Sequence, residues 1–318
     1  MGIVNVTNLK KAYGEFYAVN DITFEIESGE IFGFLGPNGA GKTSTINMLI
    51  GLSRPTEGQI IIDGIDAIKD TKRAQRIIGV VPDESNLYDE MNGFDNLCFC
   101  ASLYGIGKDE REKRARKLLK IFNLDNVADR SYKAYSKGMR RKLTIAAGII
   151  HNPKILFLDE PTTGIDVESA RQIRQLILDL KEEGKTIFLT THYIEEAERI
   201  CDRIAFIVEG KIVKISTVAD LMDNAVRERI IKLTLNSNIE EIKDELQSKF
   251  QNCRIEITDK NSCLIISKER IPLFPVLKML NNKGISVYEA KEIKPSLEDI
   301  FVKITRIKTS IEKVEIDK

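Results

Sequence analysis

The fold of this chain is decided by the stretch Gly36-Pro37-Asn38-Gly39-Ala40-Gly41-Lys42-Thr43-Ser44, which fits the phosphate-loop pattern G-x-x-x-x-G-K-[ST]. The run Glu30–Leu35 before it predicts a short buried strand, and the run Thr45–Ile50 after it predicts the first turns of a helix. In this context the glycines let backbone N–H groups turn inward around a polyphosphate, and the helix N-terminus adds partial positive charge. The alternative is a glycine turn in an ordinary α/β domain. The ordered strand, loop and helix favour a nucleoside triphosphate site instead.

A second apolar strand, Ile155–Leu158, ends in the carboxylates Asp159 and Glu160. Lys42 is placed to reach the outer phosphates, and the Thr43 hydroxyl to bind Mg²⁺. Asp159 is then expected to hold the same ion through water, while Glu160 polarises an attacking water molecule. The alternative is an acidic turn at the end of a strand. It is disfavoured because the same chain carries a phosphate loop.

Two further segments narrow the class of nucleotide-binding protein. Upstream of the acidic strand lies the basic segment Tyr135–Leu143, and downstream the run Thr190-Thr191-His192 closes the strand Thr186–Leu189. In this order the motifs resemble those of the ATP-binding subunits of ABC transporters, and the resemblance covers residues 3 to about 217. Kinases, GTPases and other motor ATPases share the phosphate loop but not this ordered set.

The resemblance assigns roles to single residues. Ser136-Lys137-Gly138-Met139 matches the signature sequence of the family, in a form common among drug- and ion-export subunits. Gly164-Ile165-Asp166 resembles the loop after the catalytic strand, and His192 resembles the switch histidine that contacts the γ-phosphate. Tyr13 matches the aromatic residue that stacks on adenine. The catalytic residues implied are Lys42, Glu160 and His192, the metal ligands are Thr43, Asp159 and, as a third candidate, Asp83, and the ATP-binding residues are Tyr13, Gly36 to Ser44, Ser136 and Gly138.

Several of these residues have a purely structural alternative. Tyr13 is also consistent with an aromatic residue at a strand edge. Ser136 is also consistent with a helix cap, and the same serine can serve both purposes, because the helix expected from about Met139 would present its N-terminal amides to a phosphate. The other histidine of the chain, His151 in the loop His151-Asn152-Pro153, is expected to be structural.

One position departs from the pattern of the family. After the strand Ile77–Val81 most members carry Pro-Gln, and the glutamine contacts Mg²⁺ and the attacking water. This chain has Pro82-Asp83-Glu84, and export subunits of this kind often carry an acidic residue there. Asp83 can ligate a hard cation, but it is one methylene shorter than glutamine. Metal binding and a purely mechanical role for this loop therefore both stay open.

The patterning predicts an α/β fold of two domains. Residues 1–218 are expected to form the ABC-type ATP-binding domain, a mixed sheet with a helical subdomain at about 91–150, and residues 225–306 a small α+β accessory domain. The accessory domain shows the element order β-α-β-β-α-β-α and is expected to be ferredoxin-like. In its last helix Leu297, Ile300 and Phe301 are expected on one face. Residues 307–318 are expected to be a frayed tail.

Composition agrees with this domain organisation. The 318 residues carry 48 Lys and Arg against 48 Asp and Glu, so no global basic field favours nucleic acid. No stretch approaches 18 consecutive apolar residues, and the N-terminal residues lack the pattern of a signal peptide. The five cysteines form no C-x-x-C pair and are expected to be reduced thiols.

These observations predict an ATPase subunit that uses ATP and Mg²⁺ and drives a separate membrane permease. The form of the signature sequence favours an exporter. The subunit is expected to sit peripherally on the cytoplasmic face of the membrane. The expected docking surface is the groove between the Asp83 loop and the helices beginning near Met91, with Leu87, Tyr88 and Phe94 as anchors. The alternative is that these residues pack the helical subdomain against the core.

The family geometry implies that two copies, or this chain and a relative, sandwich two ATP molecules, each between Lys42 of one subunit and Ser136 of the other. The alternatives are an ABC ATPase acting on ribosomes or nucleic acid, and a nucleotide-binding regulator without turnover. The transported cargo is not encoded in an ATPase subunit.

Overall fold

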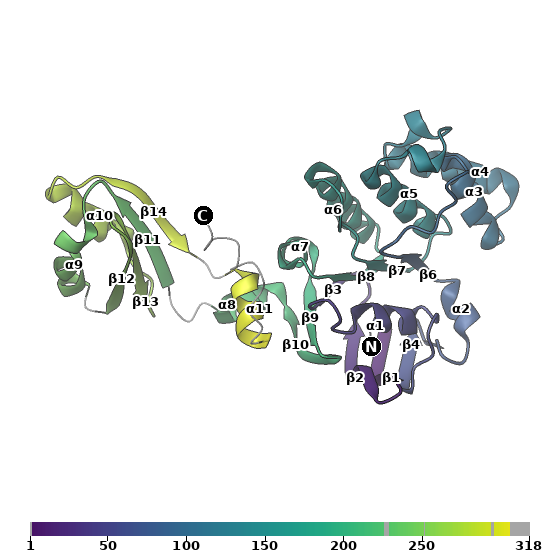
Figure 1. The fold of residues 1–318 in the computed structure, drawn as a ribbon, viewed down its shortest axis with the longest axis horizontal. Helices are drawn as coiled ribbons and strands as arrows, with labels where there is room; N and C mark the ends of the chain where they lie inside the picture. Colours follow the sequence, from purple (N-terminus) through teal and green to yellow (C-terminus); the bar gives the residue numbers. More distant parts are fainter. Residues whose placement is uncertain (1, 226–228, 251, 294–295, 306–318) are drawn as a thin grey trace. The chain divides into compact units, whose positions relative to one another are not determined.

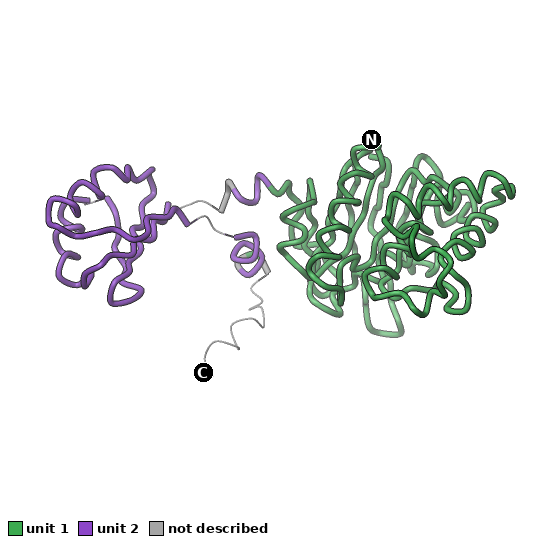
Figure 2. The backbone as a smooth tube through the Cα atoms, turned by 90° about the horizontal axis from the view of Figure 1, so that it is seen from above, with its two compact units in different colours: residues 1–218, 304–307 green, residues 219–303, 308–318 purple. Residues whose placement is uncertain are grey.

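The computed structural model describes residues 2–225, 229–250, 252–293 and 296–305. The chain divides into two compact units, with a boundary between Val218 and Ala219 (Figure 2). The first unit contains Met1–Val218, and the second contains Ala219–Lys303. In the described part of the chain, no helix combines the length and the hydropathy that a membrane crossing requires.

The first unit is built on a six-stranded sheet of order β10-β9-β3-β8-β7-β6. From one edge to the other its strands are β10 (Lys211–Thr217), β9 (Arg203–Val208), β3 (Ile31–Leu35), β8 (Thr186–Thr191), β7 (Ile155–Asp159) and β6 (Ile78–Val81). All neighbours are parallel except β10 and β9. The central strands β3, β7 and β8 are buried at every position, as expected where helices or a second sheet cover both faces.

A smaller antiparallel sheet of order β2-β1-β4-β5 packs against this sheet. Its strands are β1 (Val4–Tyr13), β2 (Phe16–Ile26), β4 (Glu57–Ile62) and β5 (Ile65–Asp66). The alternating apolar residues of β1 and β4 point to the core, which is the pattern of a sheet with one covered face. Figure 1 shows this sheet and α1 (Lys42–Leu49) on one side of the six-stranded sheet.

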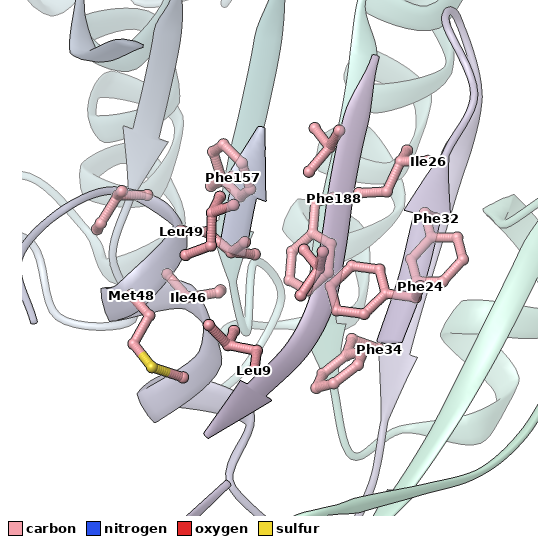
Figure 3. Close-up of a cluster of buried hydrophobic side chains, with 14 of the residues drawn as sticks. Leu9, Phe24, Ile26, Phe32, Phe34, Ile46, Met48, Leu49, Phe157 and Phe188 are labelled. Atoms are coloured by element: carbon pink, nitrogen blue, oxygen red, sulfur yellow. The ribbon is translucent and has the colours of Figure 1, made fainter. Parts of the chain in front are cut away.

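The core between the two sheets is rich in phenylalanine (Figure 3). The fully buried ring of Phe188 on β8 has four aromatic neighbours, with ring centroids 5.4 Å from Phe34, 5.7 Å from Phe157, 6.1 Å from Phe32 and 6.2 Å from Phe24. Stacked and tilted ring pairs at such distances add to the free energy gained by area burial alone. Phe188 thus ties the strands that carry the site to the antiparallel sheet.

Helices cover the other side of the six-stranded sheet (Figure 1). The helical subdomain contains α3 (Gly93–Leu103), α4 (Lys108–Ile121) and α5 (Lys137–Ile149), with the short 3-10 turns η1 (Asp125–Val127) and η2 (Tyr132–Ala134). The remaining helices of the unit are α2 (Thr71–Gln75), α6 (Val167–Glu182) and α7 (Ile194–Ile200).

Two details of the helical subdomain differ from the sequence prediction. Helix α5 begins at Lys137, two residues before the expected Met139, because the Ser136 side chain accepts from the Met139 amide at 3.2 Å and caps the helix there. The helical periodicity of residues 91–150 predicts apolar stripes that include Leu103 and Ile121, yet the two side chains are 69% and 45% exposed. Both lie at the last position of a helix, where fewer neighbours cover a side chain.

The second unit contains a four-stranded antiparallel sheet of order β12-β13-β11-β14. Its elements are α8 (Val218–Ala225), β11 (Arg229–Leu235), η3 (Ile239–Glu241), α9 (Lys243–Lys249), β12 (Cys253–Asp259), β13 (Ser262–Ser267), α10 (Leu273–Asn282), β14 (Val287–Ile293) and α11 (Leu297–Thr305). A crossover through α9 joins β11 to β12 with β13 between them, which is a split β-α-β arrangement. The ferredoxin-like assignment stays a prediction that this strand order supports.

The core of the second unit lies between its sheet and α9 and α10, and it includes Leu233, Leu246 and Leu280, all fully buried. In α11 the residues Leu297, Ile300 and Phe301 are buried, as expected of one helix face. The predicted tail at 307–318 lies outside the described residues.

We expect Phe188→Ala to lower the free energy of unfolding by about 3–5 kcal/mol, because it leaves a cavity among four aromatic rings. Phe16→Ala is the matched control, since Phe16 is 65% exposed, and it should change stability by less than about 0.5 kcal/mol. Chemical denaturation followed by circular dichroism measures both. Equal losses in the two variants would contradict the aromatic core described above.

Candidate functional site

The phosphate loop joins the end of β3 to α1, and its backbone is packed tightly against neighbouring strands. A Cβ atom at Gly36 would lie 2.3 Å from the carbonyl oxygen of Ile207, and one at Gly41 would lie 2.4 Å from that of Ala18. Gly41 also has φ 104°, a backbone conformation that L side chains rarely adopt. These glycines therefore fix the path of the loop, which turns directly into the N-terminus of α1.

Three predicted catalytic residues meet beside this loop. Lys42 donates to the carbonyl oxygen of Gly36 at 2.7 Å, and its Nζ lies 3.4 Å from Oε1 of Glu160. The other carboxylate oxygen of Glu160 lies 2.8 Å from Nδ1 of His192. The side chains of Lys42 and Glu160 are 7% and 10% exposed. A lysine from the phosphate loop, a carboxylate from the end of β7 and a histidine from the end of β8 thus form one chain of contacts.

The backbone of Glu160 is held in an unusual conformation. Its φ is 47°, which is uncommon for a residue with a side chain. Its N–H donates to the carbonyl oxygen of Thr190 at 3.1 Å, and its Oε2 accepts from the Thr163 hydroxyl at 3.1 Å. Strained backbone of this kind persists only where the surroundings hold it, and it occurs preferentially at functional sites.

Residues suited to a metal ion lie next to this cluster. Asp159, the residue before Glu160, accepts a short hydrogen bond from the Thr190 hydroxyl. The carboxyl group of Asp83 has a raised pKa, chiefly because of partial burial, with Asp159 and Glu160 raising the pKa further and Arg141 opposing them. Asp83 therefore lies within electrostatic reach of both carboxylates. Thr43 is exposed at the first turn of α1.

The signature segment is bound to a different part of the unit. Gly138 lies against α6, where an added Cβ would be 2.2 Å from the Ser169 hydroxyl oxygen. Asp166 caps α6 by accepting from the Ser169 amide at 2.8 Å. Among the residues that the structure describes, no hydrogen bond or ion pair joins Ser136 or Gly138 to the phosphate loop. The predicted ATP-binding residues thus fall into two groups, one around Lys42 and one around Ser136.

Tyr13 lies at the end of β1 beside the turn at Gly14 and is 57% exposed. The ammonium group of Lys11 lies 5.0 Å from its ring centroid, so the ring is partly covered by a cation. Its position is that of an accessible strand-edge aromatic residue. Contact with a base stays a prediction.

The donor set fits a magnesium nucleoside triphosphate. The loop places a lysine and backbone N–H groups at a helix N-terminus, which suits a polyphosphate. Carboxylate and hydroxyl oxygens, which Mg²⁺ prefers, are offered by Asp159, Asp83 and Thr43. In the described part of the chain no group of three or more His, Cys, Asp or Glu side chains is placed to hold a metal ion.

Sequence reasoning missed two buried charged residues beside the site. Arg141 on α5 is 7% exposed and donates to backbone carbonyls around the site, and Glu196 on α7 is 4% exposed and accepts from the Thr162 hydroxyl at 2.6 Å. The sequence did indicate that Arg141 is buried, because it lies one helical turn before the apolar Ile145 on the same face of the helix. A buried guanidinium requires hydrogen-bond acceptors, and here they are backbone carbonyl groups of distant loops.

His151 lies away from this cluster. Its Nε2 is 2.9 Å from the carbonyl oxygen of Ile78, and its ring stacks on Tyr104 with centroids 3.6 Å apart. Burial lowers the pKa of His151. This environment agrees with the structural role expected from the sequence.

The chain resembles known proteins over nearly its whole length. A family model described as "ABC transporter" matches residues 19–163. The linearmycin resistance ATP-binding protein LnrL of Bacillus subtilis is 34% identical, over 95% of this chain and 98% of that protein. The chain belongs to the ABC transporter ATP-binding proteins. The Nod factor export ATP-binding protein I of Cupriavidus metallidurans is 33% identical, over 95% of this chain and 97% of that protein.

Solved structures of ATP-binding cassettes agree with this assignment. The dimeric post-hydrolysis structure of the cassette MJ0796, bound to ADP and Pi, covers 68% of this chain and 98% of its own, with a TM-score of 0.63 and 29% identity. A second structure, described as the ATP-binding subunit of an ABC transporter, covers 77% and 99%, with a TM-score of 0.65 and 28% identity. The predicted family, its cassette fold and its ATPase activity are confirmed.

The buried carboxyl group of Glu196 predicts a pH-dependent effect on stability. Burial raises its pKa, so its contribution to stability is fully present below the ordinary pKa of glutamate and is lost as the pH rises through the raised value. Glu196→Gln keeps an oxygen for Thr162 and removes this ionisation. Its melting temperature relative to the parent should therefore rise between pH 4 and pH 8. A difference that stays constant across this range would contradict a raised pKa.

Proposed function

We propose that this chain hydrolyses ATP to drive a separate membrane permease of an exporter, by closure of a dimer around two ATP molecules. The observation that carries the proposal is the contact chain from Lys42 through Glu160 to His192 at the ends of three neighbouring strands. The names of the two relatives above, linearmycin resistance and Nod factor export, support an export role for this chain as well.

In this proposal each member of the contact chain has a distinct task. Lys42 binds the outer phosphates, in the place where it now donates to the carbonyl oxygens of its own loop. Glu160 accepts a proton from the attacking water, and its buried position beside Lys42 and His192 holds the carboxylate in place. His192 donates to Glu160 or contacts the γ-phosphate from the end of β8. When bound, Mg²⁺ neutralises charge on the phosphates, and Thr43, Asp159 and Asp83 are the residues that would hold it.

The second half of each nucleotide site is proposed to come from the partner subunit. Ser136 and Gly138 lie at the N-terminus of the 13-residue α5, where backbone N–H groups suit an anion. Gly138 lies against Ser169 of α6, and Ser136 bonds to the Met139 amide of its own helix. A second copy, or a related subunit, would place its signature segment over the nucleotide that Lys42 holds. The Asp166 loop lies beside the same segment.

A groove lined by residues of α1, of the loop after β6 and of α3 and α5 is the proposed docking surface for the permease. Its volume is about 280 Å³, and its apolar lining includes Leu52, Leu87, Leu103 and Tyr104. Leu52 is 74% exposed and Leu103 is 69% exposed, which is unusual for large apolar side chains and favours a protein partner. Such docking would place the chain peripherally on the cytoplasmic face of the membrane.

The three residues expected as anchors differ in their surroundings. Leu87 lines the groove, and Tyr88 is 54% exposed with its ring edge on Phe99. Phe94 is only partly exposed, and its ring is covered by the guanidinium of Arg116 at 4.7 Å. We therefore assign Phe94 to packing within the helical subdomain.

The first test concerns turnover. We expect Glu160→Gln to bind ATP with unchanged affinity and to hydrolyse it at least about 100-fold more slowly, because the amide cannot accept the proton. Lys42→Ala should instead weaken ATP binding, since it removes a charge-assisted contact. Steady-state phosphate release and equilibrium nucleotide binding separate the two effects. Hydrolysis by Glu160→Gln at the parental rate would show that another group is the base.

The second test concerns assembly. Glu160→Gln should change from monomer to dimer when ATP is added, because closure is no longer followed by hydrolysis. Adding Ser136→Arg should prevent the change, since the larger cation blocks the surface that the partner nucleotide would meet. Light scattering measures the mass with and without ATP. An unchanged mass would contradict a homodimeric sandwich and leave only a pair with a relative.

The third test concerns the membrane. Co-expression with its permease should bring the chain into the membrane fraction, and Leu87→Asp should reduce that recovery without loss of ATP binding. Val167→Asp is the matched control, because Val167 is 84% exposed and lies on α6, outside the groove. Recovery with ribosomes instead of membranes would favour the alternative class of ABC ATPase.

A further inference from the structure

The side chain of Arg141 connects two loops that flank the nucleotide site. Its Nε donates to the carbonyl oxygen of Pro161 at 2.9 Å, and its Nη2 donates to that of Asp159 at 2.6 Å. Its Nη1 donates to the carbonyl oxygens of Pro82 and Asp83, the latter at 3.0 Å. The first two acceptors belong to the end of β7, and the other two to the loop after β6.

The chemistry of the guanidinium makes this connection rigid. Its N–H donors lie in one plane and in a fixed fork, so four acceptors that share it are held at set distances from one another. Arg141 is 7% exposed. If the guanidinium were removed, the buried carbonyl oxygens would lose their donors, and this loss costs free energy. This side chain therefore fixes the backbone of Asp83 relative to that of Asp159, in addition to the pairing of β6 with β7.

Arg141 is also part of the helix that begins with the signature segment. Ser136 caps α5, and Arg141 is the fifth residue of that helix. Five residues of helix behave as a stiff element, because each backbone amide is fixed by a hydrogen bond one turn back. A movement of the Ser136 end therefore moves the guanidinium and the carbonyl groups bound to it.

We propose that Arg141 is a positioning residue, through which a nucleotide at the signature end of α5 sets the geometry of Asp83, Asp159 and Glu160 in the same chain. The inference rests on the proposed function, since it takes the nucleotide at Ser136 to be held by the partner subunit. Arg141 touches no nucleotide itself. It acts through the backbone of the two loops, so that closure at one site of a dimer prepares the carboxylates of the other.

Variants of Arg141 in the full-length chain test this proposal. Arg141→Lys keeps the charge but offers a single ammonium in place of the fork, and Arg141→Gln keeps a planar donor without the charge. Both should lower kcat by about 10- to 100-fold and raise the Mg²⁺ concentration for half-maximal hydrolysis, as loss of groups that orient metal ligands does. In the Glu160→Gln background both should still form the ATP-dependent dimer, because the surfaces that meet on closure are unchanged.

Lys142→Gln is the matched control. Lys142 is the next residue of α5 and is 9% exposed, but its ammonium donates to the side chain of Gln172 on α6 and to neither loop. Lys142→Gln removes a buried positive charge from the same helix. It should leave kcat and the Mg²⁺ requirement at the parental values. Thermal unfolding of each variant shows how far the fold itself is weakened.

The outcomes distinguish the inference from the function on which it rests. If Arg141→Lys and Arg141→Gln match Lys142→Gln in kcat and Mg²⁺ requirement, the positioning role is wrong while the proposed function stands. If the Arg141 variants lose ATP-dependent dimer formation in the Glu160→Gln background to the same extent as the single variants lose kcat, Arg141 is a structural residue only. If Glu160→Gln with Arg141 intact forms no dimer with ATP, the homodimeric form of the proposed function fails, and the inference for a homodimer fails with it.

Discussion

The parallel register of β3, β7 and β8 is the constraint on which the site depends. Leu35 at the end of β3 pairs with Thr191 of β8, and Asp159 at the end of β7 pairs with Thr190 of the same strand. Because carboxyl ends of parallel strands open onto one edge of a sheet, the loops that follow them share a crevice. The phosphate loop, Glu160 and His192 each follow one of these ends. A shift in the register of β8 would separate all three.

The charges gathered at this edge stabilise one another. Lys42 and Glu160 are nearly buried, and removing one of two such partners typically costs about 3–5 kcal/mol, because the other charge is left without compensation. The left-handed backbone of Glu160 adds strain at the same point. The phenylalanine core around Phe188 supplies the packing that holds this arrangement (Figure 3). Stability of the sheet and order of the site are therefore linked.

The sequence was sufficient to predict that residues of contiguous motifs meet at one edge of the sheet. Apolar runs in the sequence predict the strands, and the phosphate loop with Lys42, the pair Asp159 and Glu160, and His192 lie at the ends of these strands. The parallel sheet then brings these ends to one edge. The order of elements in the second unit was predictable for the same reason. Contacts between distant segments were not predictable: Arg141 reaches carbonyl oxygens 18 and 59 residues away, and no local pattern shows which loops a helix will meet.

Some errors have the same physical origin. Periodicity predicts which face of a helix is apolar, but the exposure of Leu103 depends on what lies above the helix end. The helix start at Lys137 depends on a single hydrogen bond of Ser136 to an amide three residues on. A docking role for Phe94 stays a prediction, and the sequence does not show that its ring lies under Arg116. Each case needed the spatial neighbours of a residue and not its neighbours along the chain.

Mixing of two inactive variants tests the central claim, that each nucleotide site is shared between two subunits. A Lys42→Ala chain and a Ser136→Arg chain should each be inactive alone. In a mixed dimer one site would combine the intact Lys42 of one chain with the intact Ser136 of the other. By the two-fold symmetry of such an interface, an equimolar mixture should recover ATPase activity, up to about a quarter of the parental rate if the two sites work independently. A mixture no more active than its two components would contradict the shared site.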